Sequence, residues 1–290
     1  MKNLFNKCRF DRVIIIGNGT IACDCSRILL KNGVEFEVVE SQHSSVSMLS
    51  FLCKSKDILY RSLSSADKTM DYIRKSIVNK SCLIISANNE YIFPGDICAL
   101  KNVVIINFHY SYLPNYRGMN IPTWVIFNGE ENTGVSWHYV NKDIDSGEII
   151  AREKIKISEN DKAIDIVKKG MIIGRCLFEK IIEKLLTGDS IDTVPNLSEG
   201  TVYYSRSKLP CAGYLEEMRS ALEIGRLLRA FDYGATQYIK PLKFVYDGKE
   251  YKILKYRIWC NGILLLGDTA WQESYVIKKE NYQFDLLLKE

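Results

Sequence analysis

Three polar residues in the middle of the chain, Asn107, His109 and Asp145, are the best candidates for chemistry. A side-chain amide can donate a hydrogen bond to a carbonyl oxygen that gains negative charge, and an imidazole can move a proton. A nearby carboxylate can hold the imidazole in the required orientation. One group of each kind, placed close together, would suffice to polarise a carbonyl and to transfer a proton.

Two strands and a loop would bring these groups together. Residues 103–106 form a short run of β-branched side chains, which predicts a buried strand. If this strand continues to His109, Asn107 and His109 lie on the same side of it, because side chains alternate between the two faces. Residues 134–140 predict a further strand, and the loop after it carries Asp145.

The rest of the first two thirds of the chain alternates between strand and helix patterns. Residues 13–16, 38–40 and 82–85 form short apolar runs that are typical of buried parallel strands. Residues 163–186 predict a long amphipathic helix, whose apolar spacing has a longer gap around Gly174. This order predicts an α/β fold with a Rossmann-like, doubly wound, mainly parallel sheet.

The sequence context of the other histidines and of two aromatic residues predicts structural or solvent-exposed positions for them. Trp124 and Phe127 fit the core side of an amphipathic helix over residues 122–128. His138 lies inside the strand predicted over residues 134–140, and we assign it a structural role. His43 lies in a polar, serine-rich turn, where we expect it to be solvated.

Several short motifs follow one another in a fixed order. They are N-x-H-x-S-x-L-P from Asn107, Y-R-G from Tyr116, N-G-E-x-x-T-G-V-S from Asn128 and D-x-D-S-G from Asp143. The ordered set resembles the folate-dependent formyltransferase family, densely over residues 83–150 and more weakly over residues 203–258. In motif detail it is most similar to the enzymes of amino-sugar and non-ribosomal peptide pathways.

The resemblance implies transfer of a formyl group from N10-formyltetrahydrofolate to a primary amine, without a metal. Asn107 would donate to the developing oxyanion, His109 would stabilise that charge and move a proton, and Asp145 would hold the imidazole. The residues expected against the folate are Ser86, Ala87, Asn88, Asn89, Tyr91, Leu113, Val140, Asn141, Lys142 and Asp143. Those expected against the acceptor are Ser111, Tyr116, Arg117 and Gly118, where the Arg117 guanidinium either meets an anionic group or forms a structural ion pair.

The resemblance also divides the chain. We expect residues 1–195 to form the catalytic domain, residues 196–215 to form a linker, and residues 216–290 to form a small β-rich domain. Within the last part, residues 216–231 predict a helix, and an Asp-Gly turn at residues 247–248 predicts a hairpin.

Two other functional classes stay open. Gly17, Gly19 and Ala22 follow a predicted strand, and Glu40 lies about 20 residues further on, as in the fingerprint of an NAD(P)-binding oxidoreductase. The same glycines suit any tight turn between a strand and a helix. The second of these classes is a binding module that has kept the fold and lost turnover. The presence of all three candidate residues disfavours it.

Net charge, cysteine content and the lack of a signal pattern indicate which acceptors and which cellular compartment to expect. The net charge is +4, and residues 201–290 carry 14 Lys and Arg against 11 Asp and Glu, a net charge of +3. A protein that binds tRNA through its phosphates is expected to be more basic, which disfavours methionyl-tRNA as the acceptor and nucleic acid as a partner. Nine cysteines without a framework spacing, and the absence of a secretory signal pattern or an apolar span, favour a cytoplasmic protein with reduced thiols. A small-molecule or carrier-bound amine is the expected acceptor.

Overall fold

The computed structural model describes residues 7–41, 46–197, 200–216, 219–236, 238–268, 271 and 274–290. The turn expected around His43 lies outside these residues. The chain divides into two compact units, each built from three separate segments. The first unit consists of Met1–Arg117, Gly134–Lys154 and Gly170–Val202, and the second consists of Gly118–Thr133, Ile155–Lys169 and Tyr203–Glu290.

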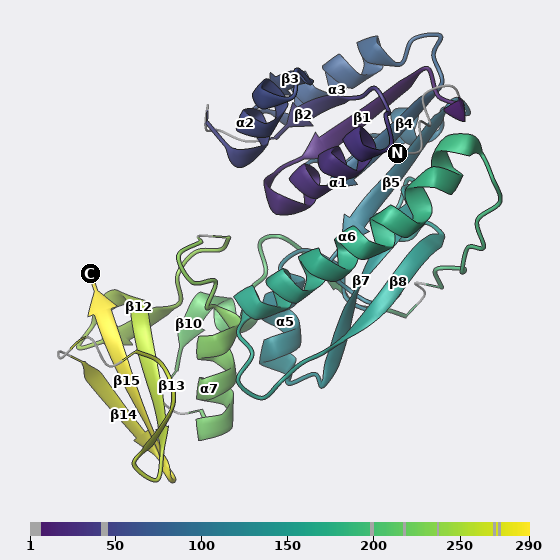
Figure 1. Ribbon diagram of the computed structural model, residues 1–290. Coiled ribbons are helices and arrows are strands. Elements are labelled where there is room, and N and C mark those ends of the chain that lie inside the picture. Colours follow the sequence, from purple (N-terminus) through teal and green to yellow (C-terminus); the bar gives the residue numbers. More distant parts are fainter. Residues whose placement is uncertain are drawn as a thin grey trace. The chain divides into compact units, whose positions relative to one another are not determined.

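A seven-stranded sheet forms the centre of the first unit (Figure 1). Its order is β3-β2-β1-β4-β5-β7-β8, in which β1 to β5 run parallel and β7 runs antiparallel to β5. Starting from β1, the chain adds β2 and β3 toward one edge of the sheet and then crosses over to add β4 and β5 toward the other edge, as in a Rossmann half. The strands are β1 Arg12–Gly17, β2 Glu37–Glu40, β3 Leu59–Ser62, β4 Cys82–Ala87, β5 Val103–His109, β7 Asn132–Tyr139 and β8 Ile149–Lys156.

Helices connect the parallel strands and cover the sheet (Figure 1). Buried side chains of the third and fourth helices, including Ile73 and Ile97, pack with Ile14, Ile84 and Ile105 of the strands. The expected α/β, doubly wound, mainly parallel fold is therefore confirmed. The helices are α1 Gly19–Lys31, α2 Met48–Ser55, α3 Ala66–Ser76, α4 Gly95–Cys98 and α6 Ala163–Thr187.

The gap in the apolar pattern of α6 around Gly174 is explained by the close packing of this helix on the sheet. Gly174 lies so close to the sheet that a Cβ atom there would be 2.3 Å from the Phe108 ring. Its carbonyl oxygen also accepts a 2.9 Å hydrogen bond from the indole of buried Trp137. Phe108 and Trp137 are directly opposite each other on β5 and β7. Their neighbours in sequence, Asn107 and His138, therefore project from the other face of the sheet.

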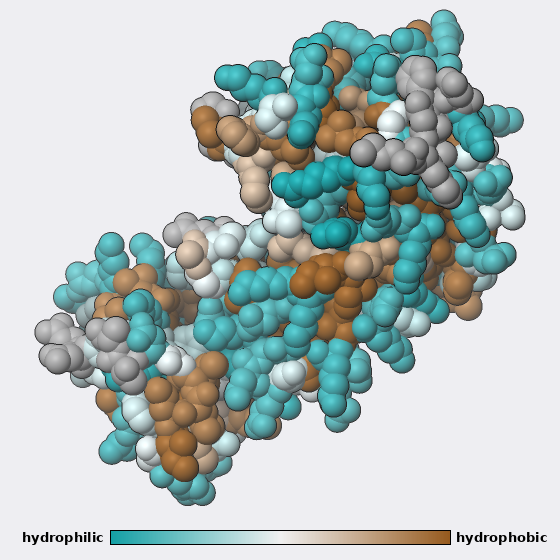
Figure 2. Space-filling model, in the orientation of Figure 1, coloured by the Kyte–Doolittle hydropathy of each residue, from teal (hydrophilic) through white to brown (hydrophobic). Residues whose placement is uncertain are grey.

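The open edge of the sheet carries apolar surface. Phe51 of α2 is 72% exposed and Leu59 of the edge strand β3 is 52% exposed, and apolar surface is visible around these two elements in Figure 2. Helix α2 still buries Leu49, Leu52 and Cys53 against the unit. Among the residues that the structure describes, no helix is both long and apolar enough to cross a membrane.

The described residues of the second unit form a six-stranded sheet, helices α5 and α7, and the first turns of α6. The sheet order is β10-β11-β12-β15-β14, with β13 paired to β12. Asp247 and Gly248 both have positive φ between β11 and β12, as the predicted hairpin turn requires. The strands are β10 Tyr214–Leu215, β11 Lys243–Tyr246, β12 Lys249–Cys260, β13 Ile263–Leu266, β14 Tyr275–Lys279 and β15 Tyr282–Lys289.

Helices α5 and α7 differ from their sequence patterns. Helix α7, Ala221–Ala230, begins later than predicted because Ser220 and Glu223 form a capping box there. Helix α5, Ile121–Asn128, was expected to be amphipathic, and this expectation is wrong. Val125 and Ile126 are buried together with Thr123, whose hydroxyl lies 2.8 Å from that of Tyr233. A helix with only one polar side chain before its last residue is buried on almost every side.

Short elements occur within the range predicted as a linker. Strand β9, Tyr203–Tyr204, pairs with the two-residue strand β6, Arg117–Gly118. A 3-10 turn over Pro210–Gly213 follows and leads into β10. The domain boundaries at residues 195 and 215 remain a prediction.

Candidate active site

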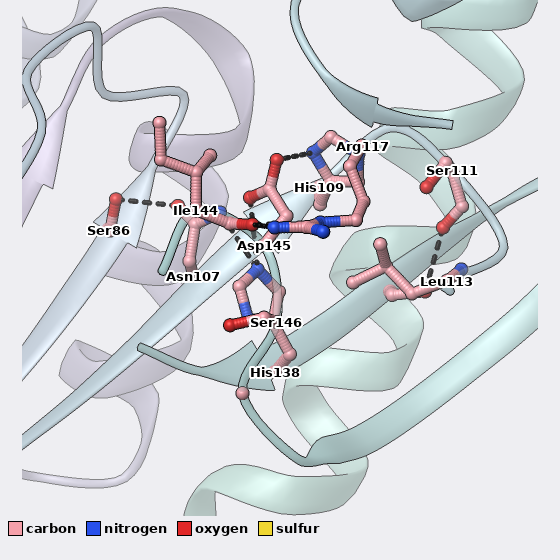
Figure 3. A network of polar contacts seen from close by, with 12 residues as sticks. Ser86, Asn107, His109, Ser111, Leu113, Arg117, His138, Ile144, Asp145 and Ser146 are labelled. Atoms are coloured by element: carbon pink, nitrogen blue, oxygen red, sulfur yellow. Dashed lines mark hydrogen bonds and ion pairs between the residues drawn. The ribbon is translucent and has the colours of Figure 1, made fainter. Parts of the chain in front are cut away.

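Asn107 lies near the carboxyl end of β5, and its side-chain amide is held from two sides (Figure 3). The hydroxyl of Ser86, near the end of the neighbouring strand β4, donates a 2.7 Å hydrogen bond to Asn107 Oδ1. Asn107 Nδ2 lies 3.1 Å from Nε2 of His138. Because parallel strands end at one edge of a sheet, the chain brings these groups together without long loops.

His138 is part of this cluster, so the purely structural place assigned to it is incomplete. It is directly opposite Asn107 in the antiparallel pair of β5 and β7. Its Nε2 also lies 3.5 Å from Oδ1 of Asp145, and its side chain is 2% exposed. The alternation of β7 already places His138 and Ser136 on one face. Only the register between the two strands, which the local sequence does not specify, reveals that this face is the one carrying Asn107.

His109 occupies the same face of β5 two residues further along. Its Nε2 lies 2.8 Å from the carbonyl oxygen of Tyr116, and its Nδ1 lies 3.6 Å from Oδ2 of Asp145. A carbonyl oxygen can only accept, so Nε2 carries a hydrogen. The contact of Nδ1 with the carboxylate is attractive only when Nδ1 is protonated as well.

Asp145 lies between the two imidazoles, and its loop is fixed by backbone contacts. Its two carboxylate oxygens face different histidines, and its side chain is 10% exposed. Asn196 donates from Nδ2 to the carbonyl oxygens of Asp145 and Gly147, at 2.9 and 3.0 Å. A Cβ atom on Gly147 would be 1.9 Å from the carbonyl oxygen of Tyr139. Only glycine permits this approach, which explains the glycine of the D-x-D-S-G motif.

Arg117 makes a contact that was not among the alternatives considered for it, and its predicted contact with the acceptor stays a prediction. Its Nε donates a 2.9 Å hydrogen bond to the carbonyl oxygen of Ile144, and its Nη2 donates to the same oxygen. The guanidinium thus holds the residue just before Asp145. The neighbouring Tyr116 takes a left-handed conformation, φ 58°, which presents its carbonyl to His109. Gly118 has a positive φ of 100°, and a Cβ atom there would lie 2.1 Å from the carbonyl oxygen of Tyr204, so the position requires glycine.

The loop after β4, predicted to meet the folate, is tied to neighbouring loops. Asn88 donates from Nδ2 to the side chain of Asn18, whose backbone N–H donates to Ala87. Asn89 donates to the carbonyl of Tyr91 and accepts from its N–H. These amide groups hold the loop itself, so a ligand bound here would be contacted mainly through the backbone.

In the second segment predicted to contact the folate, residues 140–143, polar groups also form hydrogen bonds within the protein. Val140 donates its backbone N–H to the carbonyl of Ile105, and Asn141 Oδ1 accepts from the Asp143 N–H and the Ser146 hydroxyl. Lys142 and Asp143 are exposed to solvent, whereas the Asp145 side chain is only 10% exposed.

The loop after β5 is anchored by a serine that sequence reasoning missed. The Ser136 hydroxyl donates to the carbonyl of Ser111 at 2.7 Å and accepts from the N–H of buried Leu113 at 3.1 Å. Ser111 itself is buried, and its hydroxyl has no hydrogen-bond partner in the described part of the chain. Ser136 belongs to the same face of β7 as His138, so the same register places both.

The glycine-rich turn after β1 has a structural explanation. A Cβ atom on Gly17 would be 1.8 Å from the carbonyl oxygen of Ala87, so the close approach of β1 to β4 alone requires glycine. Glu40 is fully buried and accepts hydrogen bonds from Ser47 and Tyr60. Burial, together with this carboxylate, raises the pKa of Tyr60 to about 12. The acid of the dinucleotide fingerprint is thus engaged with the protein.

Among the described residues, no group of three or more His, Cys, Asp or Glu side chains lies close enough together to hold a metal ion. The nine cysteines are unpaired.

Comparison with known proteins gives the family. A model of the formyl transferase family matches residues 7–175, more than half of the chain. The chain belongs to the formyl transferase family. The resemblance noted in the sequence motifs is confirmed, and the matched segment includes all four members of the Asn107, His109, His138 and Asp145 cluster.

Individual formyltransferases are similar over most of the chain. GDP-perosamine N-formyltransferase of Brucella melitensis is 29% identical over 246 residues, which cover 83% of this chain and 92% of that protein. Methionyl-tRNA formyltransferase of Clostridioides difficile is 27% identical over 237 residues, covering 78% and 75%. The crystal structure of an N-formyltransferase from Helicobacter canadensis in complex with folinic acid and dTDP-3-aminofucose shares the fold, with a TM-score of 0.70, 19% identity and coverage of 96% and 99%.

Proposed function

We propose that this formyl transferase family member moves a formyl group from N10-formyltetrahydrofolate to the primary amine of a nucleotide-linked amino sugar. The convergence of Asn107, His109 and Asp145 in one partly buried cluster is the observation that carries the proposal. The similarity to GDP-perosamine N-formyltransferase over most of both chains supports a sugar amine as the acceptor.

The roles of the side chains follow from their contacts. The folate would supply the formyl group as an amide, whose nitrogen becomes the leaving group. As the amine nitrogen bonds to the formyl carbon, Asn107 would donate from Nδ2 to the oxygen that gains charge. His109, whose Nδ1 faces the carboxylate of Asp145, would stabilise that charge in its protonated form. It would give its proton to the departing folate nitrogen and recover one from the attacking amine.

The residues around the cluster fit a folate. The loops at residues 86–91 and 140–143 use their own asparagine side chains internally, which leaves peptide groups to pair with the donors and acceptors of a pterin ring. Ser111, Tyr116, Arg117 and Gly118 remain predicted acceptor contacts. The buried, unpartnered Ser111 hydroxyl supports a ligand contact at that position.

The test is a product assay. The protein is incubated with N10-formyltetrahydrofolate and a panel of amines (GDP- and dTDP-linked amino sugars, carrier-bound amino acids and methionyl-tRNA), and products are identified by mass spectrometry. We expect a formylated nucleotide sugar, and saturable binding of 5- or 10-formyl folates with no comparable binding of NADPH. Saturable nicotinamide binding without folate binding would overturn the proposal.

A second acceptor is supported by one comparison. Similarity to a methionyl-tRNA formyltransferase spans 75% of that protein, whereas the modest net charge of +4 favours a smaller acceptor. Binding of tRNA through several phosphates would make log Kd rise steeply with log salt concentration, by about 0.9 per phosphate contact on duplex regions. Such a slope, together with activity on methionyl-tRNA, would replace the sugar by the tRNA as the acceptor.

A further inference from the structure

Both ring nitrogens of His138 lie within hydrogen-bond distance of a neighbouring polar atom. Its Nδ1 lies 2.8 Å from the carbonyl oxygen of Tyr139, and the imidazole is almost completely buried. A carbonyl oxygen has no hydrogen to give, so Nδ1 must carry one. In the neutral ring the other nitrogen, Nε2, then has a lone pair and can only accept.

This tautomer determines the orientation of the amide of Asn107. The group 3.1 Å from His138 Nε2 must be a donor, and Asn107 Nδ2 is the donor end of that amide. Asn107 Oδ1 in turn accepts from the Ser86 hydroxyl. The Tyr139 carbonyl thus fixes His138, and His138 fixes Asn107. One hydrogen of Nδ2 is engaged by His138, and its second hydrogen can be given to a ligand.

We propose that neutral His138, protonated on Nδ1, is a positioning residue that aims the Asn107 amide at the oxygen of the reacting formyl group. This inference rests on the proposed function. If His138 were protonated on both nitrogens, two donors would face each other at 3.1 Å, and Nε2 would instead pair with Asp145 Oδ1 at 3.5 Å. The shorter contact with Asn107 selects the neutral ring.

The first test reads the tautomer directly. The chain has only three histidines, so nitrogen-15 labelling of histidine gives a small set of signals. His43→Asn and His138→Gln variants assign them. In the protein without ligands at neutral pH, we expect His138 to show a protonated Nδ1 and an unprotonated Nε2. A His138 protonated on Nε2, alone or together with Nδ1, would overturn the inference.

The second test measures coupling to Asn107. His138→Leu removes the acceptor, and we expect kcat to fall about 10- to 100-fold with little change in the folate KM, because a buried hydrogen bond to the reacting amide is lost. His138→Gln supplies a carbonyl acceptor and should recover part of that loss. In an Asn107→Ala background, His138→Leu should cost almost nothing further, because its target is already absent.

A matched control comes from the same strand. Thr133 of β7 is buried, and its hydroxyl has no hydrogen-bond partner among the described residues. Thr133→Val therefore makes a buried position of β7 apolar without removing a hydrogen bond, and kcat should stay near that of the wild type. Equal losses for Thr133→Val and His138→Leu, or additive losses in the double variant, would contradict the positioning role.

The outcomes separate this inference from the proposed function. If the wild-type protein formylates none of the amines tested, the proposed function fails, and the NMR experiment still decides the tautomer. If formyl transfer is observed and the tautomer or the coupling is not, only the role of His138 fails.

Discussion

At the scale of single residues, the cluster is held largely by the peptide backbone. His109 is fixed by the carbonyl of Tyr116 and His138 by that of Tyr139, and the backbone carbonyl of Asp145 accepts a hydrogen bond from the Asn196 side chain. Backbone groups of a folded sheet move little, so the side chains they hold are kept close to one geometry. The same arrangement allows the contributions of the side chains to be ranked.

The first prediction is that ranking. His109→Ala should lower kcat most, because it removes the proton carrier and a positive charge together. Asn107→Ala should lower kcat by about 10² to 10³, as the loss of one oxyanion donor does in other enzymes. Asp145→Asn should also lower kcat, but by less than His109→Ala does. For all three, the KM for folate should change far less than kcat, because these contacts strengthen in the transition state.

Asp143→Asn is the control for that series. Asp143 lies in the same loop as Asp145 and is exposed. Steady-state kinetics of both variants decide the assignment, and Asp143→Asn should retain nearly full activity. Loss of turnover in Asp143→Asn with full turnover in Asp145→Asn would show that the wrong carboxylate was assigned.

The second prediction concerns Arg117. Two guanidinium nitrogens donate to the carbonyl of Ile144, so Arg117→Ala should loosen the position of Asp145 and lower kcat. The loss of charge-assisted hydrogen bonds of this kind is worth about 1.5–3 kcal/mol, or roughly 10- to 100-fold. If Arg117 instead binds an anionic acceptor, Arg117→Ala will raise the acceptor KM and leave kcat almost unchanged. Initial rates over a range of acceptor concentrations distinguish the two results.

At the scale of elements, the third prediction tests the packing of α6 on the sheet. Alanine favours a helix over glycine by about 1 kcal/mol. At Gly174, however, a Cβ atom would lie 2.3 Å from the Phe108 ring, and overpacking typically costs about 1–3 kcal/mol. Gly174→Ala should therefore lower the free energy of unfolding. Ile172→Ala, in the same helix at a position that is 67% exposed, should change it little. Denaturant unfolding of both variants measures the difference, and a stabilised Gly174→Ala would contradict the packing.

The sequence predicted elements better than the contacts between them. The strands ending at Gly17, Ala87 and His109 follow from local apolar runs, because burial on both faces leaves a clear pattern. The antiparallel pairing of β5 with β7 depends on a register between residues about 30 positions apart, which no local pattern contains. For this reason Asn107 and His109 could be selected from the sequence, whereas their contact partner His138 could not.

Arg117 was unpredictable for a related reason. Its target is a main-chain carbonyl of the loop that precedes Asp145. Every residue carries such a group, so nothing in the sequence marks that one. The choice between an ion pair and a ligand contact left out this common alternative, in which a side chain supports a functional loop.

At the scale of the whole molecule, the fourth prediction concerns truncation after residue 195. Segments 118–133 and 155–169 belong to the same compact unit as residues 203–290. Without the tail, Thr123 loses its contact with Tyr233, and Phe127 of α5 loses the apolar cluster against which it packs. The fragment 1–195 should bind a hydrophobic dye such as ANS and unfold at a lower temperature than the full chain. Dye fluorescence and a thermal melt check this, and a fragment as stable as the whole protein would support a separate catalytic domain ending there.

The interleaving of the two units also limits how this protein can be recombined with its relatives. A chimera made by joining the first 195 residues of one enzyme to the tail of another would pair segments 118–133 and 155–169 with a foreign partner. An exchange that keeps each unit intact must transplant all three segments of the second unit together. Crossover sites at residues 117/118, 133/134, 154/155, 169/170 and 202/203 meet that requirement.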